Sequence, residues 1–176
     1  MPNSRLRRAA LVLLPLVGIG GAWAAVFASA SAGASARASG RVQSHAVARH
    51  RHSLSGLAVV PLTVSSANGR HRFRVEVAAS PAQQEKGLMF RTAMGADEGM
   101  IFPYKQPQRV SFWMQNCPLA LDIIFIGTDH RVLNIADARP FDETPLASAG
   151  AVSNVLELNN GRAAALGIRP GDRVDW

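Results

Sequence analysis

Short apolar runs separated by turn residues dominate residues 57–176, and this pattern predicts a mainly β fold. In the clearest run, 71–77, apolar and charged residues alternate, so one face is expected to be buried and the other, with Arg72, Arg74 and Glu76, to face solvent. Further runs bounded by Pro, Gly, Asn or Asp occur at 59–64, 99–102, 108–114, 121–126, 131–138 and 152–158. The sequence therefore predicts a small β-sandwich or barrel-like domain.

Two short helices are expected beside these strands. Ser80-Pro81-Ala82-Gln83 has the residues of a capping box with proline at the first helical position, and Gly87 is expected to end that helix after about two turns. A second short helix is expected at 161–166, followed by a turn and a last strand near Val174. Asn68-Gly69 supplies the residues of a tight hairpin turn.

The N-terminal residues follow a different pattern, which predicts export. Residues 1–8 hold three arginines, and the 28 residues from Ala9 to Ala36 carry no charge. A basic start, an apolar stretch and small-x-small sequences such as Ala28-Ser29-Ala30 are typical of a cleavable signal peptide. A retained membrane anchor is the alternative, because about 20 apolar residues suffice to cross a bilayer. Residues 1–36 are thus predicted to be a signal peptide or membrane anchor, with the domain periplasmic, secreted, or held outside the cytoplasm.

Residues 37–56 are predicted to be a flexible basic linker, because they contain few large apolar side chains. The linker histidines His45, His50 and His52 could in principle bind a metal, but a solvated linker explains them without one. The folded domain is therefore placed at 57–176.

The positive charge of the chain lies in its N-terminal part. The net charge is +7, yet residues 1–56 hold seven arginines and no acidic residue, while residues 57–176 hold twelve basic and twelve acidic residues. A neutral domain behind an exported basic tail argues against nucleic-acid binding.

Sulfur-containing residues give no reason to expect a metal or cofactor. The single cysteine, Cys117, excludes an intramolecular disulfide and a multi-cysteine metal site, and we expect it to be a small, half-buried hydrophobic residue. Met89, Met94, Met100 and Met114 lie in separate segments, so core packing explains them better than copper(I) binding. No cofactor and no metal site is predicted.

Six short motifs occur in an order that resembles one family. They are Gly87-Leu-Met89-x-Arg91, Gly99-Met100-Ile-Phe102, Phe112-Trp-Met114-x-Asn116, Pro118 to Phe125 with Asp122, Leu156-Glu157-Leu158 with Gly161, and Gly171-Asp172-x-Val174. Together they resemble the prokaryotic family DUF192, the domain of unknown function 192, and the resemblance covers residues 59–176. The resemblance implies a small mainly-β domain, frequently behind an export signal, with a shared site and no established activity. Cys117 departs from the family pattern, which usually has Thr at this place.

The polar residues of these motifs are the candidate ligand-binding site. If Arg91, Asn116, Asp122 and Glu157 converge beside Trp113, they could hold a small polar ligand by stacking and bidentate hydrogen bonds. Asp122 lies on an otherwise apolar strand face, so it is expected to have a hydrogen-bonding partner. The alternative is that Arg91 pairs with Asp122 or Glu157 to stabilise the fold, while Asn116 satisfies loop backbone.

Three classes of function remain open at this point. The favoured one is an exported, non-catalytic domain that binds a small polar ligand or a cell-envelope component. The second is an envelope hydrolase with Asp122 and Glu157 as an acid/base pair, whose carboxyl groups would have to lie about 5 to 9.5 Å apart. The third is a structural or partner-interaction module without a ligand. The membrane is a partner only if the N-terminal segment is retained, and the sequence leaves the oligomeric state open.

Overall fold

The computed structural model describes residues 50–176. The predicted signal or anchor segment, 1–36, and residues 37–49 of the predicted linker, His45 included, lie outside the described residues. Within residues 50–176, no helix has the length and apolar character needed to cross a bilayer.

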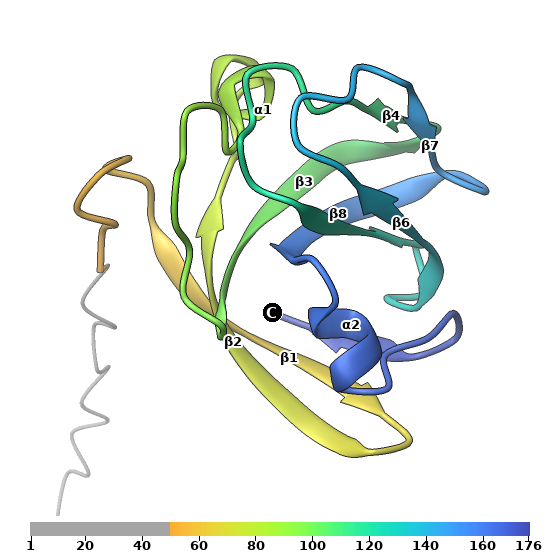
Figure 1. The fold of residues 1–176 in the computed structure, drawn as a ribbon. Coiled ribbons are helices and arrows are strands. Elements are labelled where there is room, and N and C mark those ends of the chain that lie inside the picture. The colour runs from red at the N-terminus through yellow and green to blue at the C-terminus, as the bar shows by residue number, and fades with distance from the viewer. Residues whose placement is uncertain (1–49) are drawn as a thin grey trace, which may run out of the picture. The chain divides into compact units, whose positions relative to one another are not determined.

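A seven-stranded mixed sheet forms the domain (Figure 1). In chain order its strands are β1 (Val59–Ser66), β2 (Gly69–Val77), β3 (Glu98–Gln108), β5 (Leu121–Ile126), β6 (Val132–Ala138), β8 (Val152–Asn159) and β9 (Arg173–Asp175). Their order across the sheet is β6-β5-β8-β3-β2-β1-β9, and every neighbouring pair is antiparallel except β2 and β3. A separate two-stranded sheet pairs β4 (Ser111–Phe112) with β7 (Leu146–Ala147). The predicted mainly β fold with two short helices is confirmed.

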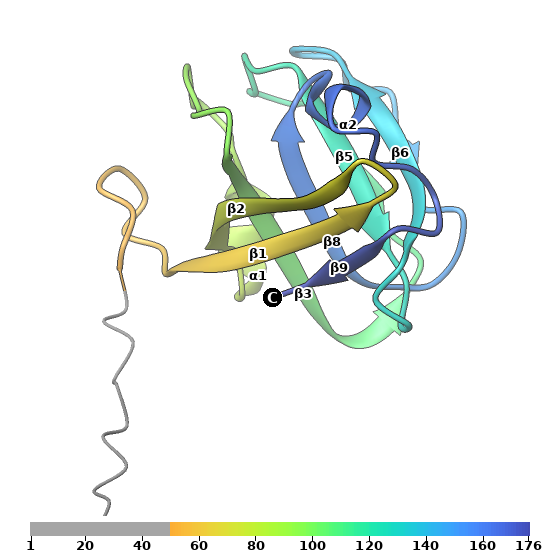
Figure 2. The ribbon, with the colours of Figure 1, turned by 90° about the horizontal axis from the view of Figure 1, so that it is seen from below.

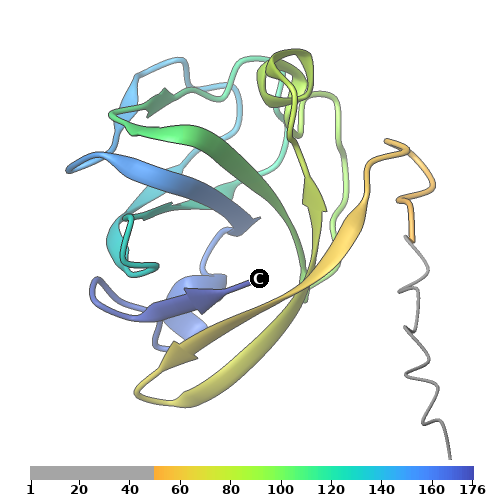
Figure 3. The ribbon, with the colours of Figure 1, turned by 180° about the vertical axis from the view of Figure 1, so that it is seen from behind.

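The two edges of the large sheet meet, which makes the domain barrel-like (Figures 2 and 3). Arg131, just before β6, forms an isolated bridge with Arg173 of β9. Two backbone hydrogen bonds flank this bridge, from Val132 N to Asp172 O at 2.9 Å and from Val174 N to His130 O at 2.8 Å. The edge groups of β9 and of the start of β6 are therefore partly satisfied by each other.

The helices begin and end as their sequence signals predict. In α1 (Pro81–Lys86), Ser80 Oγ accepts a hydrogen bond from Gln83 N at 3.3 Å, and Gln83 Oε1 accepts one from Ser80 N at 2.9 Å. Gly87 follows with a positive φ of 43°, which suits glycine. The second predicted helix is α2 (Arg162–Ala165).

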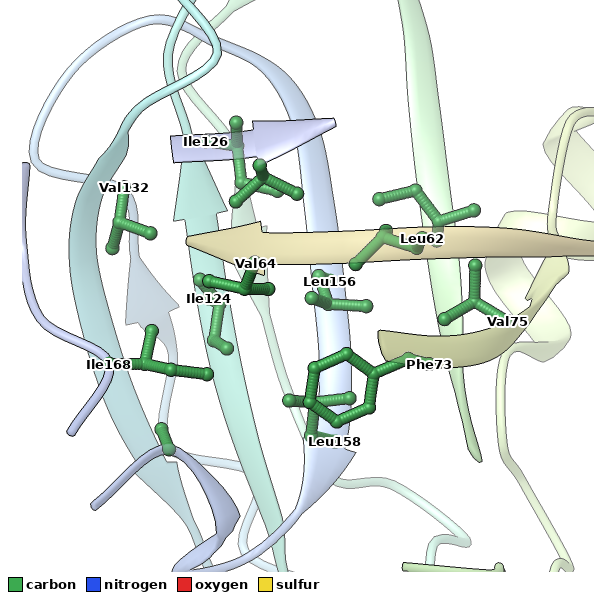
Figure 4. Packing of buried hydrophobic residues seen from close by; sticks show 13 residues of the cluster. Leu62, Val64, Phe73, Val75, Ile124, Ile126, Val132, Leu156, Leu158 and Ile168 are labelled. Carbon is green, nitrogen blue, oxygen red and sulfur yellow. The ribbon is translucent and has the colours of Figure 1, made fainter. Parts of the chain in front are cut away.

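Two hydrophobic clusters lie on opposite faces of β5 and β8. Figure 4 shows the first, in which residues of β1 and β2 pack against Ile124 and Leu156 where the strands cross. The second contains Ile123 and Val155 and is covered by residues of the small sheet and by the segment after α1. Because both faces are covered, all six residues of β5 are buried. Met100 and Met114 are fully buried in the second cluster, as predicted for core packing.

The first described residues contact the domain and correct one prediction about β2. Val59 N donates to His50 O at 2.8 Å, and Arg51 forms a bridge with Ala58. Glu76 was predicted to face solvent, but it is only 4% exposed, because Ser55 and neighbouring groups cover the end of β2. The alternating pattern predicted the strand correctly, but it predicted the wrong environment for Glu76, the last charged residue of the strand.

Candidate functional site

Two of the five predicted site residues, Trp113 and Glu157, line one cavity. This cavity, called the Trp113 cavity below, has a volume of about 210 Å³ and is lined by residues of α1, β3, β4 and β8 and of the segments beside them. Its lining combines aromatic rings, thioethers and a few polar groups: Gln84, Glu85, Lys86, Gly87, Leu88, Met89, Phe102, Tyr104, Ser111, Phe112, Trp113, Met114, Gln115, Cys117, Leu121 and Glu157.

Glu157 contributes a buried carboxyl group to this cavity. In the strand ladders it lies opposite Met100 of β3 and Ile123 of β5, so its strand is flanked on both sides. The residue is 5% exposed, and its Oε2 atom has no hydrogen-bond partner among the described residues. Burial raises the pKa of Glu157 to about 8, because surroundings of low polarity disfavour the charged form. At neutral pH the carboxyl is therefore mostly protonated, and it can donate as well as accept a hydrogen bond.

Two further titratable groups lie close enough to respond to Glu157. Burial, with a smaller contribution from the charge of Glu157, raises the pKa of Tyr104 to about 12. Burial also raises the pKa of the Cys117 thiol; a backbone hydrogen bond with Leu119 opposes this increase, and the charge of Glu157 adds to it. Both groups are therefore neutral near pH 7, and Cys117 is not activated as a nucleophile.

Trp113 lies at the rim of the cavity with its side chain 54% exposed. Its neighbours hold it there: Phe112 packs edge-on against Phe102, with ring centroids 5.1 Å apart, and Met114 N donates to Asp142 O at 2.9 Å. An exposed indole on a well-anchored segment is available for stacking against a ligand.

Asp122 does not line the cavity but caps α2. Its Oδ1 accepts from Gly161 N at 3.0 Å, and its Oδ2 accepts from Ala163 N at 2.7 Å. Asn160 Nδ2 adds a longer contact of 3.4 Å. The prediction that Asp122 has a hydrogen-bonding partner is confirmed, and these partners are the backbone groups that a short helix leaves free at its N-terminus.

Arg91 forms an ion pair with a residue that the sequence analysis did not select. Its Nη1 lies 2.9 Å from Glu76 Oε1, and its Nη2 lies 3.1 Å from Glu76 Oε2. Ser55 Oγ also donates to Glu76, and His52 Nε2 lies 3.7 Å from Glu76 Oε1. The stabilising role considered for Arg91 is thus observed, although its partner is neither Asp122 nor Glu157.

Asn116 is exposed and has a backbone role in its loop. Its φ is 56°, a conformation that Asn tolerates better than most residues, and its carbonyl oxygen accepts from Phe90 N at 2.8 Å. Arg91, Asn116 and Asp122 therefore do not converge with Glu157 at the Trp113 cavity.

The proposed acid/base pair of Asp122 and Glu157 is wrong for a geometric reason. Asp122 is paired with Leu158 and Ile123 with Glu157, so the two acidic residues occupy successive positions of the ladder. Successive positions point to opposite faces of a sheet. Asp122 accordingly faces α2 on the side of the first hydrophobic cluster, whereas Glu157 faces the cavity on the other side.

Several lining residues were not predicted as site residues, among them Gln84, Tyr104 and Met114. Gln84 lies on α1, and its Nε2 donates to Pro103 O at 2.8 Å, which ties the helix to β3 beside the cavity. Tyr104 is the only tyrosine of the chain and follows a predicted strand, a signal that could have marked it. Within residues 50–176, no three His, Cys, Asp or Glu side chains gather in a group able to hold a metal ion.

Replacing Asp122 with Asn should destabilise the domain, because an amide cannot accept backbone hydrogen bonds with both of its polar atoms. We expect Asp122→Asn to lower the free energy of unfolding by about 1 to 3 kcal/mol, as measured by urea denaturation. Asp137→Asn is the control, because Asp137 lies opposite Asp122 in the ladder, is exposed, and accepts a side-chain hydrogen bond from Asn160. Equal losses in the two variants would contradict the capping role.

Replacing Glu157 with Gln should remove a pH dependence of stability. The native pKa of about 8 lies above the ordinary value of 4.5, so the folded state binds this proton more tightly than the unfolded state. The free energy of unfolding should therefore fall as pH rises from 4.5 to 8, by up to about 1.4 kcal/mol per pH unit from this group. Urea denaturation at pH 5, 6.5 and 8 should show that the free energy of unfolding of the wild-type protein falls with pH by several kcal/mol more than that of Glu157→Gln. Parallel pH profiles would show that Glu157 is already ionised in the folded protein.

Comparison with known proteins agrees with this architecture. The family DUF192, described as "Uncharacterized ACR, COG1430", matches residues 63–176. A protein of unknown function from Novosphingobium aromaticivorans DSM 12444 is 55% identical and superposes with a TM-score of 0.72, over 74% of this chain and 94% of that one. A proposed transcription regulator from Sinorhizobium meliloti 1021 is 39% identical with a TM-score of 0.66, over 68% of this chain and 94% of that one. Among curated proteins, none matches the chain. On the family match and these two similarities, the chain belongs to the DUF192 family.

Proposed function

We propose that this DUF192 domain binds a small polar molecule in the Trp113 cavity. The observation that carries the proposal is the buried Oε2 atom of Glu157, which lines the cavity and has no hydrogen-bond partner among the described residues. A buried polar atom without a partner costs on the order of 1 to 3 kcal/mol, more if it is charged. A ligand that hydrogen-bonds to this atom would recover that free energy.

The rest of the lining supports a small ligand with both polar and apolar parts. Phe102, Phe112 and Leu121 supply apolar walls, while Gln84 and Tyr104 supply groups that can orient a polar ligand. Binding sites commonly combine apolar walls with a few polar groups in this way. The volume of about 210 Å³ lies below the roughly 300 to 1,000 Å³ usual for ligand pockets, which favours a small occupant.

This proposal narrows the predicted ligand-binding set to Trp113 and Glu157. The structural-module alternative explains Arg91, Asn116 and Asp122, which serve the fold. It gives no reason for a cavity beside an exposed indole with a buried carboxyl group inside it.

A binding screen with two matched tryptophan variants tests the proposal. The full chain is screened by thermal unfolding and ligand-observed NMR against amino acids, monosaccharides, short amines, short carboxylic acids and polyols. We expect at least one compound to raise the unfolding midpoint of the unaltered protein and of Trp176→Ala, and to lose most of this effect in Trp113→Ala. Both indoles are about half exposed, but only Trp113 lines the cavity, so folding should survive in both variants. Binding in the cavity would be contradicted if no compound raised the unfolding midpoint, or if compounds raised it equally in Trp113→Ala and Trp176→Ala.

We also infer that the domain acts outside the cytoplasm. The inference is supported by the N-terminal sequence, in which three arginines in residues 1–8 are followed by 28 uncharged residues. This segment lies outside the described part of the chain. Mass measurement of the full-length gene product recovered from fractionated cells tests this. A periplasmic or secreted form lacking about 30 to 36 N-terminal residues, or a membrane-held form open to external protease, is expected. An intact chain confined to the cytoplasmic fraction would overturn the inference.

A further inference from the structure

We propose that the occupant of the Trp113 cavity is a small organic cation, a protonated amine whose N–H group donates to the free oxygen of Glu157. This inference rests on the proposed function and adds the charge and chemical class of the ligand. It follows from the carboxyl group, the aromatic walls and the charged residues around the cavity.

The carboxyl group lacks any cationic partner of its own. No ion pair between described residues involves Glu157, whereas the other buried glutamate, Glu76, is held by Arg91 in a bidentate pair. A buried carboxylate is stable only when a cation or several hydrogen bonds compensate its desolvation. An ammonium group would supply a compensating positive charge and would also donate a hydrogen bond to Oε2, neither of which the described residues provide.

The aromatic lining favours a cation in the same place. Phe102, Tyr104, Phe112 and Trp113 all line the cavity, and ring faces attract ammonium groups. Such contacts are stronger where water is excluded. An anionic ligand would be repelled by the ionised carboxyl group of Glu157 and would gain no cation–π contact, so it is disfavoured.

The remaining titratable groups of the cavity do not compete for Glu157. Tyr104 of β3 and Cys117 of the loop after β4 are neutral near pH 7, since both pKa values are raised. Glu85 and Lys86 of α1 are the other charged lining residues, and both are exposed to solvent. Strand β5 contributes only Leu121 to the lining.

Binding of a cation should be coupled to release of a proton. Below pH 8 the free Glu157 is mostly protonated, so the ammonium ligand displaces that proton to the buffer and leaves an ammonium–carboxylate pair. The affinity should therefore rise about tenfold per pH unit between pH 6 and pH 7.5. A neutral ligand that accepts a hydrogen bond from protonated Glu157 would show no such rise.

Three isosteric probes test the inference on the full chain by isothermal titration calorimetry. They are benzylammonium, benzyl alcohol and benzoate, which share one ring and differ in charge. We expect benzylammonium to bind tighter than benzyl alcohol by at least tenfold at pH 7.5, and benzoate not to bind. The released proton is taken up by the buffer, so the heat of benzylammonium binding should differ between phosphate and Tris. The difference should equal the difference in buffer ionisation enthalpy for about one proton.

Variants assign the effect to named groups. Glu157→Gln keeps the shape and removes the charge, so benzylammonium affinity should fall at least tenfold and lose its pH dependence. Trp113→Ala should weaken binding severalfold, and Trp176→Ala, the exposed indole outside the cavity, should leave it unchanged.

The outcomes separate this inference from the proposed function. Binding of benzyl alcohol or benzoate with no preference for benzylammonium would keep a binding cavity and overturn the cationic ligand. Absence of binding by all three probes would also overturn it, while hits from the broader screen would still support the cavity. Benzylammonium binding that is unaffected by Glu157→Gln would show that the cation binds elsewhere.

Discussion

A carboxyl group buried on a central strand is the constraint on which the candidate site depends. Strand β8 has β3 on one side and β5 on the other, so two ladders fix the backbone of Glu157, and its side chain lies on the face that the second hydrophobic cluster occupies. The close fit of the strands reinforces this, because a Cβ atom on Gly99 would lie 2.5 Å from the carbonyl oxygen of Glu157. The raised pKa of Glu157 therefore follows from its burial on this covered face, where it lines the Trp113 cavity.

The period of two in a β-strand separates the cap of α2 from the candidate binding site in this domain. Asp122 and Glu157 occupy successive positions of the β5–β8 ladder, and so they belong to different faces. On one face Asp122 accepts backbone hydrogen bonds and fixes α2 against the sheet. On the other face an oxygen atom of Glu157 has no hydrogen-bond partner within residues 50–176. Residues that look alike in sequence, two acids in apolar strands, thus have opposite roles.

Local sequence patterns predicted the strands and helices well. The residues whose burial or role was not predicted are those whose surroundings depend on contacts between distant parts of the chain. The capping box at Ser80 and the need of Asp122 for a partner follow from short-range chemistry and were predicted. The burial of Glu76 was not, because it depends on Ser55 and Arg91, which are distant in sequence. Tyr104 was missed for the same reason, since only the folded sheet brings it near Glu157.

The same geometry favours binding over two-carboxylate hydrolysis. Such hydrolysis needs an acid and a base on either side of one bond, with different environments that separate their pKa values. Glu157 has one such environment, but Asp122, the partner that the sequence suggested, is committed to α2 on the far side of the sheet. A single buried carboxyl group facing aromatic rings is instead suited to hold a donor group in place. The position of Asp122 therefore gives it no part in hydrolysis at the Trp113 cavity, and the single buried carboxyl group supports the proposed binding of a ligand.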